Sequence, residues 1–135
     1  METMEELEPP MTTVQYPNMR AEVVGALKAL SDHEYQQRVW TRHDYPHDKF
    51  YDDLTTNLNI LFDDTCVLPD PKQRIGWILY PNEVEALREL AEVLDPLITE
   101  LGDADDTHYL EHSQWGEVVR RAGNAQSVFN QNDGE

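Results

Sequence analysis

Two histidines and two aspartates fall within six residues of the sequence: His43, Asp44, His47 and Asp48. Imidazole and carboxylate groups this close together could bind a divalent ion or act as acid and base. Pro46 lies between the histidines and prevents a helix from fixing their geometry. The sequence therefore favours a polar turn in which Asp48 caps a following helix.

A second pair of histidines, His108 and His112, is four residues apart, with Glu111 between them. On one helix this spacing would place both imidazoles on the same face, as metal-binding pairs require. The polar segment that contains them is short, and the sequence fixes no third ligand. We therefore interpret them as two exposed histidines in a polar connector, with a metal site as the alternative.

Two pairs of adjacent aspartates, Asp52-Asp53 and Asp63-Asp64, resemble the carboxylates with which phosphoryl-transfer enzymes hold metal ions. The sequence has no glycine-rich phosphate-binding loop to accompany them. Its single cysteine, Cys66, is not placed beside a base and excludes a disulfide framework within the chain. We predict that the protein is not an enzyme, with no catalytic residues, no metal and no other cofactor.

The chain has 10 Lys and Arg against 27 Asp and Glu, a formal net charge of −17. Such a charge repels nucleic acid and anionic membranes and attracts basic surfaces. A general role in solubility is an equally good explanation of the charge. The distribution adds one observation, because residues 43–64 hold six acids, all aspartates, and a single base. The six are Asp44, Asp48, Asp52, Asp53, Asp63 and Asp64.

A length of 135 residues suits one domain. We predict a disordered acidic N-terminal tail over residues 1–16, a single helical domain over 17–130 and a frayed C-terminal tail over 131–135. The chain has no run of 18 apolar residues and no basic, apolar start, so we expect no membrane segment and no signal peptide. A cytoplasmic protein is the resulting expectation.

Apolar residues at helical spacing predict four helices, with a short additional one over residues 31–40. The four cover residues 18–30, 48–62, 82–101 and 114–129, and their expected caps are Asn18, Asp48, Asn82 and Ser113. The apolar run at 75–80 is β-prone but has no second strand to pair with, so a buried extended segment or a turn is expected. The fold class that we predict is all-α, a compact four- to five-helix bundle with a short extended apolar segment near residues 75–80.

Several short stretches of the sequence form a recognisable set: Tyr45 to Leu54, Leu61 to Thr65, Asp70-Pro71, Ile75-Gly76-Trp77, Tyr109-Leu110, and Trp115 with Val118-Val119. Together they resemble a family of small acidic bacterial proteins of uncharacterised function. The resemblance covers about residues 20–129 and implies a self-contained single domain, with no catalytic residues to carry over.

From charge and composition we predict an acidic protein-binding inhibitor, such as an immunity protein. It would capture a basic protein partner and block its active or binding surface, with no direct contact to nucleic acid or membrane. Carboxylates would steer the encounter, and a few aromatic side chains would anchor the complex. The residues predicted to bind the partner are the six aspartates of residues 43–64 together with Tyr45, Tyr51 and Trp77.

Three other interpretations stay open on the sequence alone. The first is a mimic of nucleic-acid charge, including a phage-encoded one, that blocks a DNA- or RNA-binding defence machine. The second is a metal-binding enzyme or regulator that uses His43 and His47. The third concerns assembly, because exposed aromatic residues within 75–80 would favour a homo-oligomer.

Overall fold

Helix α1 (Pro17–Leu30) opens a computed structural model that describes residues 14–134. Proline at the first helical position costs no hydrogen bond, because that amide has no partner inside the helix. The helix therefore starts at Pro17, and the predicted cap, Asn18, lies within its first turn. Its inward stripe is fully buried and includes Val23, Leu27 and Leu30.

Helix α2 (His33–Tyr35) continues directly into the π-helical segment η1 (Gln36–Thr41). The carboxylate of Asp32 accepts a hydrogen bond from the Tyr35 amide at 3.0 Å and so caps α2. The widened coil of η1 places Trp40 in the core, where its side chain is 2% exposed.

The third predicted helix begins six residues later than its apolar spacing suggests. Residues 42–53 form a loop, and α3 (Leu54–Asn59) follows it and runs on into the π-helical segment η2 (Ile60–Asp64). Asp53 caps α3 by accepting from the Thr56 amide at 2.8 Å, so the prediction of Asp48 as the cap is wrong. The reason is that Phe50 falls at helical spacing with the apolar residues that follow it, but its ring packs against Tyr45 within the loop.

Between η2 and α4 the chain makes two 3-10 turns, η3 (Pro71–Arg74) and η4 (Pro81–Glu83). The apolar run between them is a tight turn, closed by a hydrogen bond from the Gly76 amide to the Leu79 carbonyl at 2.9 Å. Gly76 has a φ of 86°, a conformation that favours glycine. The turn buries Ile78 and Leu79 and leaves Trp77 half exposed.

The last three helices are α4 (Val84–Leu101), α5 (Asp106–Glu111) and α6 (Trp115–Asn132). Helix α4 continues through Pro96 and ends at Gly102, whose φ is 56°. The predicted caps Asn82 and Ser113 are both wrong. At α4 the Glu83 carboxylate instead accepts from the Tyr80 amide at 2.8 Å, and α6 starts after Gln114.

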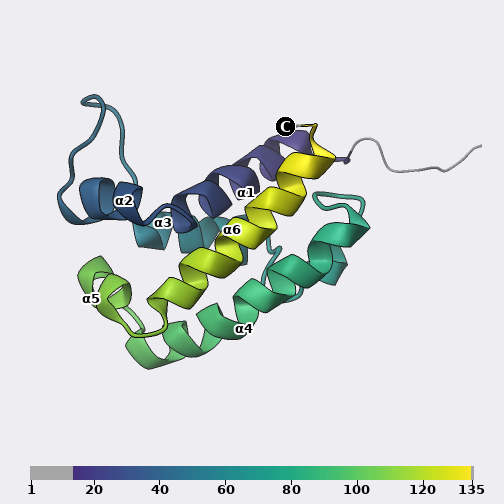
Figure 1. Cartoon of the computed structure of the whole chain (residues 1–135). Coiled ribbons are helices and arrows are strands. Elements are labelled where there is room, and N and C mark those ends of the chain that lie inside the picture. The colour runs from purple at the N-terminus through teal and green to yellow at the C-terminus, as the bar shows by residue number, and fades with distance from the viewer. Residues whose placement is uncertain (1–13, 135) are drawn as a thin grey trace, which may run out of the picture.

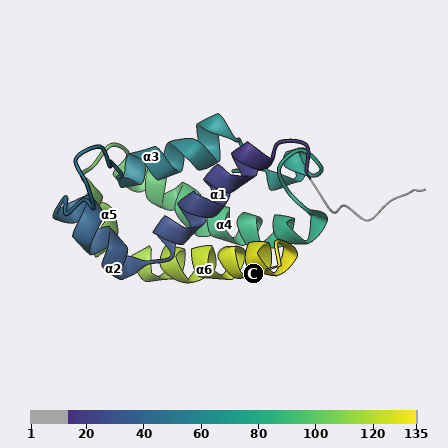
Figure 2. The ribbon, with the colours of Figure 1, turned by 90° about the horizontal axis from the view of Figure 1, so that it is seen from above.

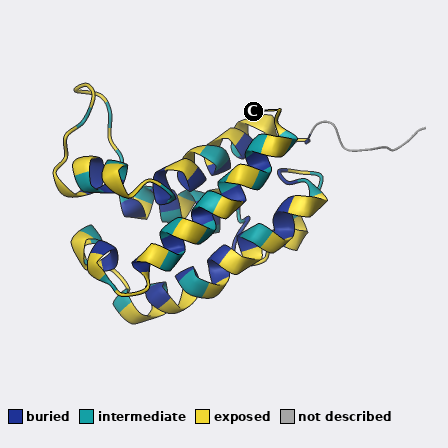
Figure 3. Ribbon diagram, in the orientation of Figure 1, coloured by how far each residue is buried: buried dark blue, intermediate teal, exposed yellow. Residues whose placement is uncertain are grey.

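The helices assemble in the order α3, α1, α6, α4: α1 packs against α3 and α6, and α6 packs against α4 (Figure 1). Seen from above, α3 lies on the other side of α1 from α6, and α5 lies beside the start of α3 (Figure 2). The buried stripes of the helices face one another (Figure 3). Six α-helices and no strand within residues 14–134 confirm the predicted all-α class. None of the helices described is long and apolar enough to span a membrane.

One end of the bundle is held by a buried ion pair between Arg20 of α1 and Glu83 of η4. The guanidinium donates to both carboxylate oxygens, at 2.8 and 2.6 Å, and to the Ile78 carbonyl at 3.0 Å. It also lies between the rings of Tyr80 and Phe129, at 4.7 and 4.5 Å from their centroids. We call these five residues the Arg20 cluster.

The first and the last described residues both meet this end of the bundle. The amides of Gln15 and Tyr16 donate to the carbonyls of the 75–79 turn at 3.1 and 2.8 Å. At the other terminus, where the sequence predicts fraying from residue 131, α6 extends to Asn132. Asn132 donates to Glu83 at 2.8 Å, and Asp133 accepts from Arg20 at 3.2 Å. Of the predicted N-terminal tail, residues 1–13 lie outside the described residues.

Candidate functional site

The structure separates the residues predicted to bind a partner into two groups at different ends of the bundle (Figure 1). One group lies in the 42–53 loop, beside α5. The other lies at the end of η2 and in the 75–79 turn, which are linked because Arg74 donates to the Thr65 carbonyl at 3.0 Å. The first group is Asp44, Tyr45, Asp48, Tyr51, Asp52 and Asp53, and the second is Asp63, Asp64 and Trp77.

Aromatic rings pack together within the 42–53 loop. The Tyr45 ring stacks on His43 and contacts Phe50 and Tyr51, with centroid distances of 5.9, 5.8 and 6.0 Å. His47 packs edge-on against Phe50 at 5.9 Å. These contacts replace the expected helix, and they leave Tyr51 64% exposed, as the most exposed large apolar side chain described.

Asp52 is an internal hydrogen-bond acceptor. Its carboxylate accepts from the Tyr35 hydroxyl and the Trp40 indole, both at 2.8 Å, and from the Asn57 amide at 2.9 Å. Burial and the bond to this carboxylate raise the pKa of Tyr35. Asp52 therefore joins the loop to η1 and α3, and most of its acceptor capacity is used within the chain.

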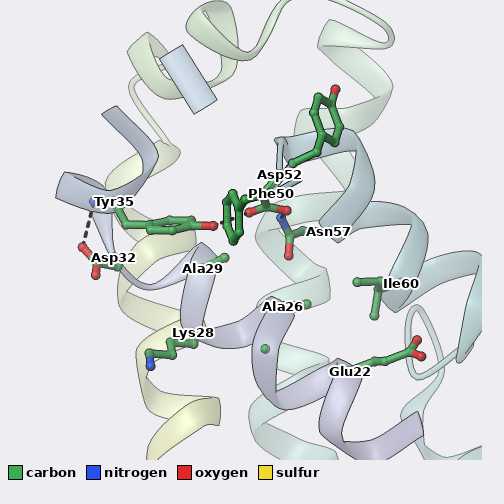
Figure 4. A pocket seen from close by; sticks show the side chains of 12 residues that line it. Glu22, Ala26, Lys28, Ala29, Asp32, Tyr35, Phe50, Asp52, Asn57 and Ile60 are labelled. Carbon is green, nitrogen blue, oxygen red and sulfur yellow. Dashed lines mark hydrogen bonds between the residues drawn. The ribbon is translucent and has the colours of Figure 1, made fainter. Parts of the chain in front are cut away.

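A pocket of about 420 Å³ opens between α1 and the loop, and we call it the α1 pocket (Figure 4). Helix α1 lines it with three small residues, Gly25, Ala26 and Ala29, and with the charged Glu22 and Lys28. Phe50 and Ile60 form further apolar lining, and the bonded Asp52 lies at its polar end. The shape could accept a small apolar group.

A second hollow, of about 400 Å³, lies on the α5 side of the same loop. Four aspartates line it, and we call it the acidic hollow: Asp53, Asp103, Asp105 and Asp106. Tyr51 and His43 also line it, and no Lys or Arg is found among its described lining residues. A concave site with one sign of charge concentrates the field and attracts ions of the opposite sign.

Two of these carboxylates are fixed by contacts with α3. Asp106 accepts from the Leu54 amide at 3.0 Å, which joins the start of α5 to the start of α3. Burial, followed by the charges of Asp53 and Asp105, raises the pKa of Asp106. Burial acts in the same direction on Asp53, but hydrogen bonds from Tyr51 and Thr56 outweigh it and lower the pKa of that carboxyl.

The Tyr51 hydroxyl donates to the Asp53 carboxylate, which fixes the exposed ring at the edge of the acidic hollow. This bond, with the nearby charge of Asp53, raises the pKa of Tyr51 to about 12. The phenol therefore remains neutral near pH 7. It can offer a partner an apolar ring next to a concentrated negative field.

Sequence reasoning missed three of the four aspartates of the hollow, those at 103, 105 and 106. They are more than forty residues from the loop along the chain, and the contact between Asp106 and the Leu54 amide brings them to it. The local signal was present, because residues 103–106 hold three aspartates and no base.

The histidines are used in other ways than as paired ligands. His43 and His47 face different rings of the loop. His112 follows the end of α5, so it does not share a helical face with His108, and its ring contacts Glu100 at 3.1 Å and accepts from the Gln114 amide at 3.0 Å. Within residues 14–134, no three His, Cys, Asp or Glu side chains are grouped to hold a metal ion.

At the other end of the bundle, Trp77 is 50% exposed. Its ring meets Tyr16 edge-on at 6.0 Å, and the Arg74 guanidinium lies 5.6 Å from its centroid. Asp63 and Asp64 are exposed at the end of the nearby η2. This surface presents aromatic, basic and acidic groups together, in contrast to the acidic hollow.

A family model described as Domain of unknown function (DUF7945) matches residues 14–135. The chain belongs to this family. Its match begins at Val14, the residue at which the described structure also begins and whose side chain is 9% exposed. Membership confirms the expected family of uncharacterised function. No curated protein and no solved structure matches the chain significantly.

Proposed function

We propose that this domain is an acidic protein-binding inhibitor that captures a basic protein at the acidic hollow and covers its active or binding surface. The observation that carries the proposal is the hollow itself, where four aspartates converge around about 400 Å³ with no Lys or Arg among its described lining residues. In such a protein the net charge of −17 has a use beyond solubility. The expected setting is the bacterial cytoplasm.

The crowding of carboxylates favours a cation in the hollow. Burial is the largest cause of the raised pKa of Asp106, and the negative charges of Asp53 and Asp105 raise that pKa further, so these carboxylates repel each other there. A Lys or Arg side chain of the partner would remove the repulsion and pair with the carboxylates. Electrostatic attraction of this kind mainly accelerates association and selects basic partners.

Tyr51 would supply the apolar part of the contact. It is 64% exposed, held by its bond to Asp53, and lies beside the carboxylates. An aromatic side chain with a fixed orientation loses little conformational entropy on binding and is typical of energetic hot spots. Asp44 and Asp48, both exposed on the same loop, would contribute to long-range attraction.

The test compares two double variants that each remove two negative charges, one pair in the acidic hollow and one pair at the end of η2. Asp103→Asn with Asp105→Asn changes two exposed aspartates of the hollow, whereas Asp63→Asn with Asp64→Asn changes two exposed aspartates elsewhere. Each serves as bait for partners from the native cell, and the affinity for each recovered protein is then measured. We expect a basic partner whose affinity falls about fivefold or more with the hollow variant and changes little with the control.

Two results would contradict the proposal. One is a partner that binds both double variants as well as it binds the wild-type protein. The other is the recovery of acidic or neutral partners only. Competition with duplex DNA separates the charge-mimic alternative, because a partner displaced by DNA uses its nucleic-acid-binding surface to bind this protein.

A further inference from the structure

A groove lies next to the acidic hollow on the side of the bundle. It has a volume of about 320 Å³ and lies between α3 with η2 on one side and α4 on the other. We call it the α3–α4 groove. Thr55 and Asp103 line both the hollow and the groove, so the two are adjacent.

The groove follows the helix axes on both sides. Its lining runs from Thr55 to Phe62 on one wall and from Asp95 to Gly102 on the other. Each span covers eight residues, or seven steps along the chain, which is about two helical turns or about 10 Å. The bundle order explains the opening, because α3 packs against α1 and α4 packs against α6, and α3 and α4 are not among the closely packed helix pairs of residues 14–134.

The floor of the groove is apolar. Leu58, Phe62 and Ile98 line it, and each is only partly buried although it packs against the core. The charged groups at its edge are Asp95 and Asp103. Taken together, the described linings of the groove and the hollow hold five aspartates and no Lys or Arg.

We infer that the partner presents a basic amphipathic helix, whose apolar face lies in the α3–α4 groove while a Lys or Arg at one end enters the acidic hollow. This inference rests on the proposed function and names the class of ligand for it. An apolar groove about two turns long between two helices matches the stripe of anchors that one helix presents. The surrounding aspartates match basic residues on the flanks of that stripe.

Charge also argues against a second copy of this chain as the occupant. Each copy carries a net charge of −17, so two copies repel each other. The arginines of α6 are already paired within the chain, Arg120 with Glu117 and Arg121 with Glu117 and Glu92. A separate basic partner is therefore the occupant to which the groove is complementary.

The experiment uses the full chain and two synthetic peptides of identical composition, about 15 residues of Leu and Lys. In the first, the leucines form one helical face. In the second, the order is scrambled so that no helical face is apolar. Binding is measured by fluorescence anisotropy and helix formation by circular dichroism. We expect the amphipathic peptide to bind about tenfold more tightly and to become helical on binding.

A variant that fills the groove tests the location. Asn59 is exposed on α3 and lines the groove, so Asn59→Trp adds bulk without removing a core side chain or a charge. The matched control is Asn124→Trp on the exposed face of α6. We expect Asn59→Trp to weaken the amphipathic peptide about tenfold and to leave the scrambled peptide unchanged. Asn124→Trp should change neither.

The outcomes distinguish this inference from the proposed function. If both peptides bind equally and Asn59→Trp has no effect, but Asp103→Asn with Asp105→Asn weakens both, the groove inference is wrong and the hollow still captures basic groups. If neither peptide binds, or if the hollow variant has no effect on either, the proposed function fails and the groove inference with it. Asp63→Asn with Asp64→Asn is the charge control in every arm.

Discussion

Charges are treated in opposite ways at the two ends of this bundle. At the Arg20 cluster a guanidinium and a carboxylate are both almost wholly buried, and each satisfies the other at 2.6 and 2.8 Å. At the acidic hollow four carboxylates lie together with no Lys or Arg among the described lining residues. The first arrangement joins α1, η4 and α6, and the second gathers negative charge in a concave surface.

The difference between the Arg20 cluster and the acidic hollow indicates which end of the bundle binds a partner. A buried pair that satisfies itself offers nothing to bind, and its role is to fix the position of the elements that it joins. A group of like charges in fixed positions is stabilised by each cation that binds among them, because the cation reduces their mutual repulsion. Stability and binding are therefore assigned to different ends, and substitutions at the two ends should separate them.

The largest effect is expected at the Arg20 cluster. Arg20→Met should lower the free energy of unfolding by about 3–5 kcal/mol, because it leaves the Glu83 carboxylate buried without its partner. Arg88→Met is the matched control, since Arg88 forms an exposed pair with Glu85 and should cost about 1 kcal/mol or less. Urea denaturation measures both. Equal losses in the two variants would contradict the distinction between the ends.

Asp52 should show that one loop aspartate belongs to the structure. Asp52→Ala removes the acceptor for Tyr35, Trp40 and Asn57, and we expect a loss of about 1–3 kcal/mol. The pKa of Tyr35 should fall at the same time. The control is Asp48→Ala, an exposed aspartate on the same loop, with a change within about 0.5 kcal/mol. A larger loss from Asp48→Ala would show that the loop is held differently.

Protonation of Asp106 in the acidic hollow should change the stability of the fold with pH. The folded pKa of Asp106 is raised above its ordinary value of 3.8, so the folded state binds the proton more tightly than the unfolded state does. Its contribution is therefore most favourable below pH 3.8 and is lost as the pH rises through the folded pKa.

Asp106→Asn keeps an acceptor for the Leu54 amide and removes this charge. We expect the variant to be more stable than wild type at pH 7, by less than about 1 kcal/mol, and equal to it at low pH. Thermal unfolding across the pH range measures the difference. A variant that is less stable at pH 7 would show that repulsion in the hollow is absent.

The smallest effect concerns Tyr51 and changes a pKa with little change in stability. Its pKa of about 12 comes chiefly from its bond to the Asp53 carboxylate. Asp53→Asn keeps the oxygen that caps α3 and removes the charge, so the pKa of Tyr51 should return toward 10.0. NMR of the Tyr51 ring carbons measures it. An unchanged pKa would mean that the ring is not held at the edge of the hollow.

Long runs of apolar residues at helical spacing made most of the fold predictable. The apolar positions of α4 and α6 predict helices whose ends lie within three residues of those observed. Trp40 and Trp115 are core residues, each 2% exposed. The start of α3 was misplaced because Phe50 falls at helical spacing although its partners are other rings of the loop. Hydrophobic periodicity depends only on spacing along the chain, so it does not detect contacts of this kind.

The site was less predictable, because its contacts join distant residues. Asp52 and Asp53 are adjacent and chemically identical, yet one is bonded inside the structure and the other faces the hollow. Gln36 gives a similar example, since it is fully buried and bonds both the end of α1 and the indole of Trp115. No local pattern distinguishes such roles, which depend on what the folded chain places nearby.

The wide coil of η1 also limits how this family can vary in length. A π-helical turn contains one residue more than an α-helical turn. Winding the same residues, Gln36 to Thr41, as a regular α-helix would turn everything after them by roughly 100° about the axis. The Trp40 indole would then point away from Asp52, and the loop would lose its attachment. We therefore expect a homologue that lacks the π-helical turn to be one residue shorter in this segment.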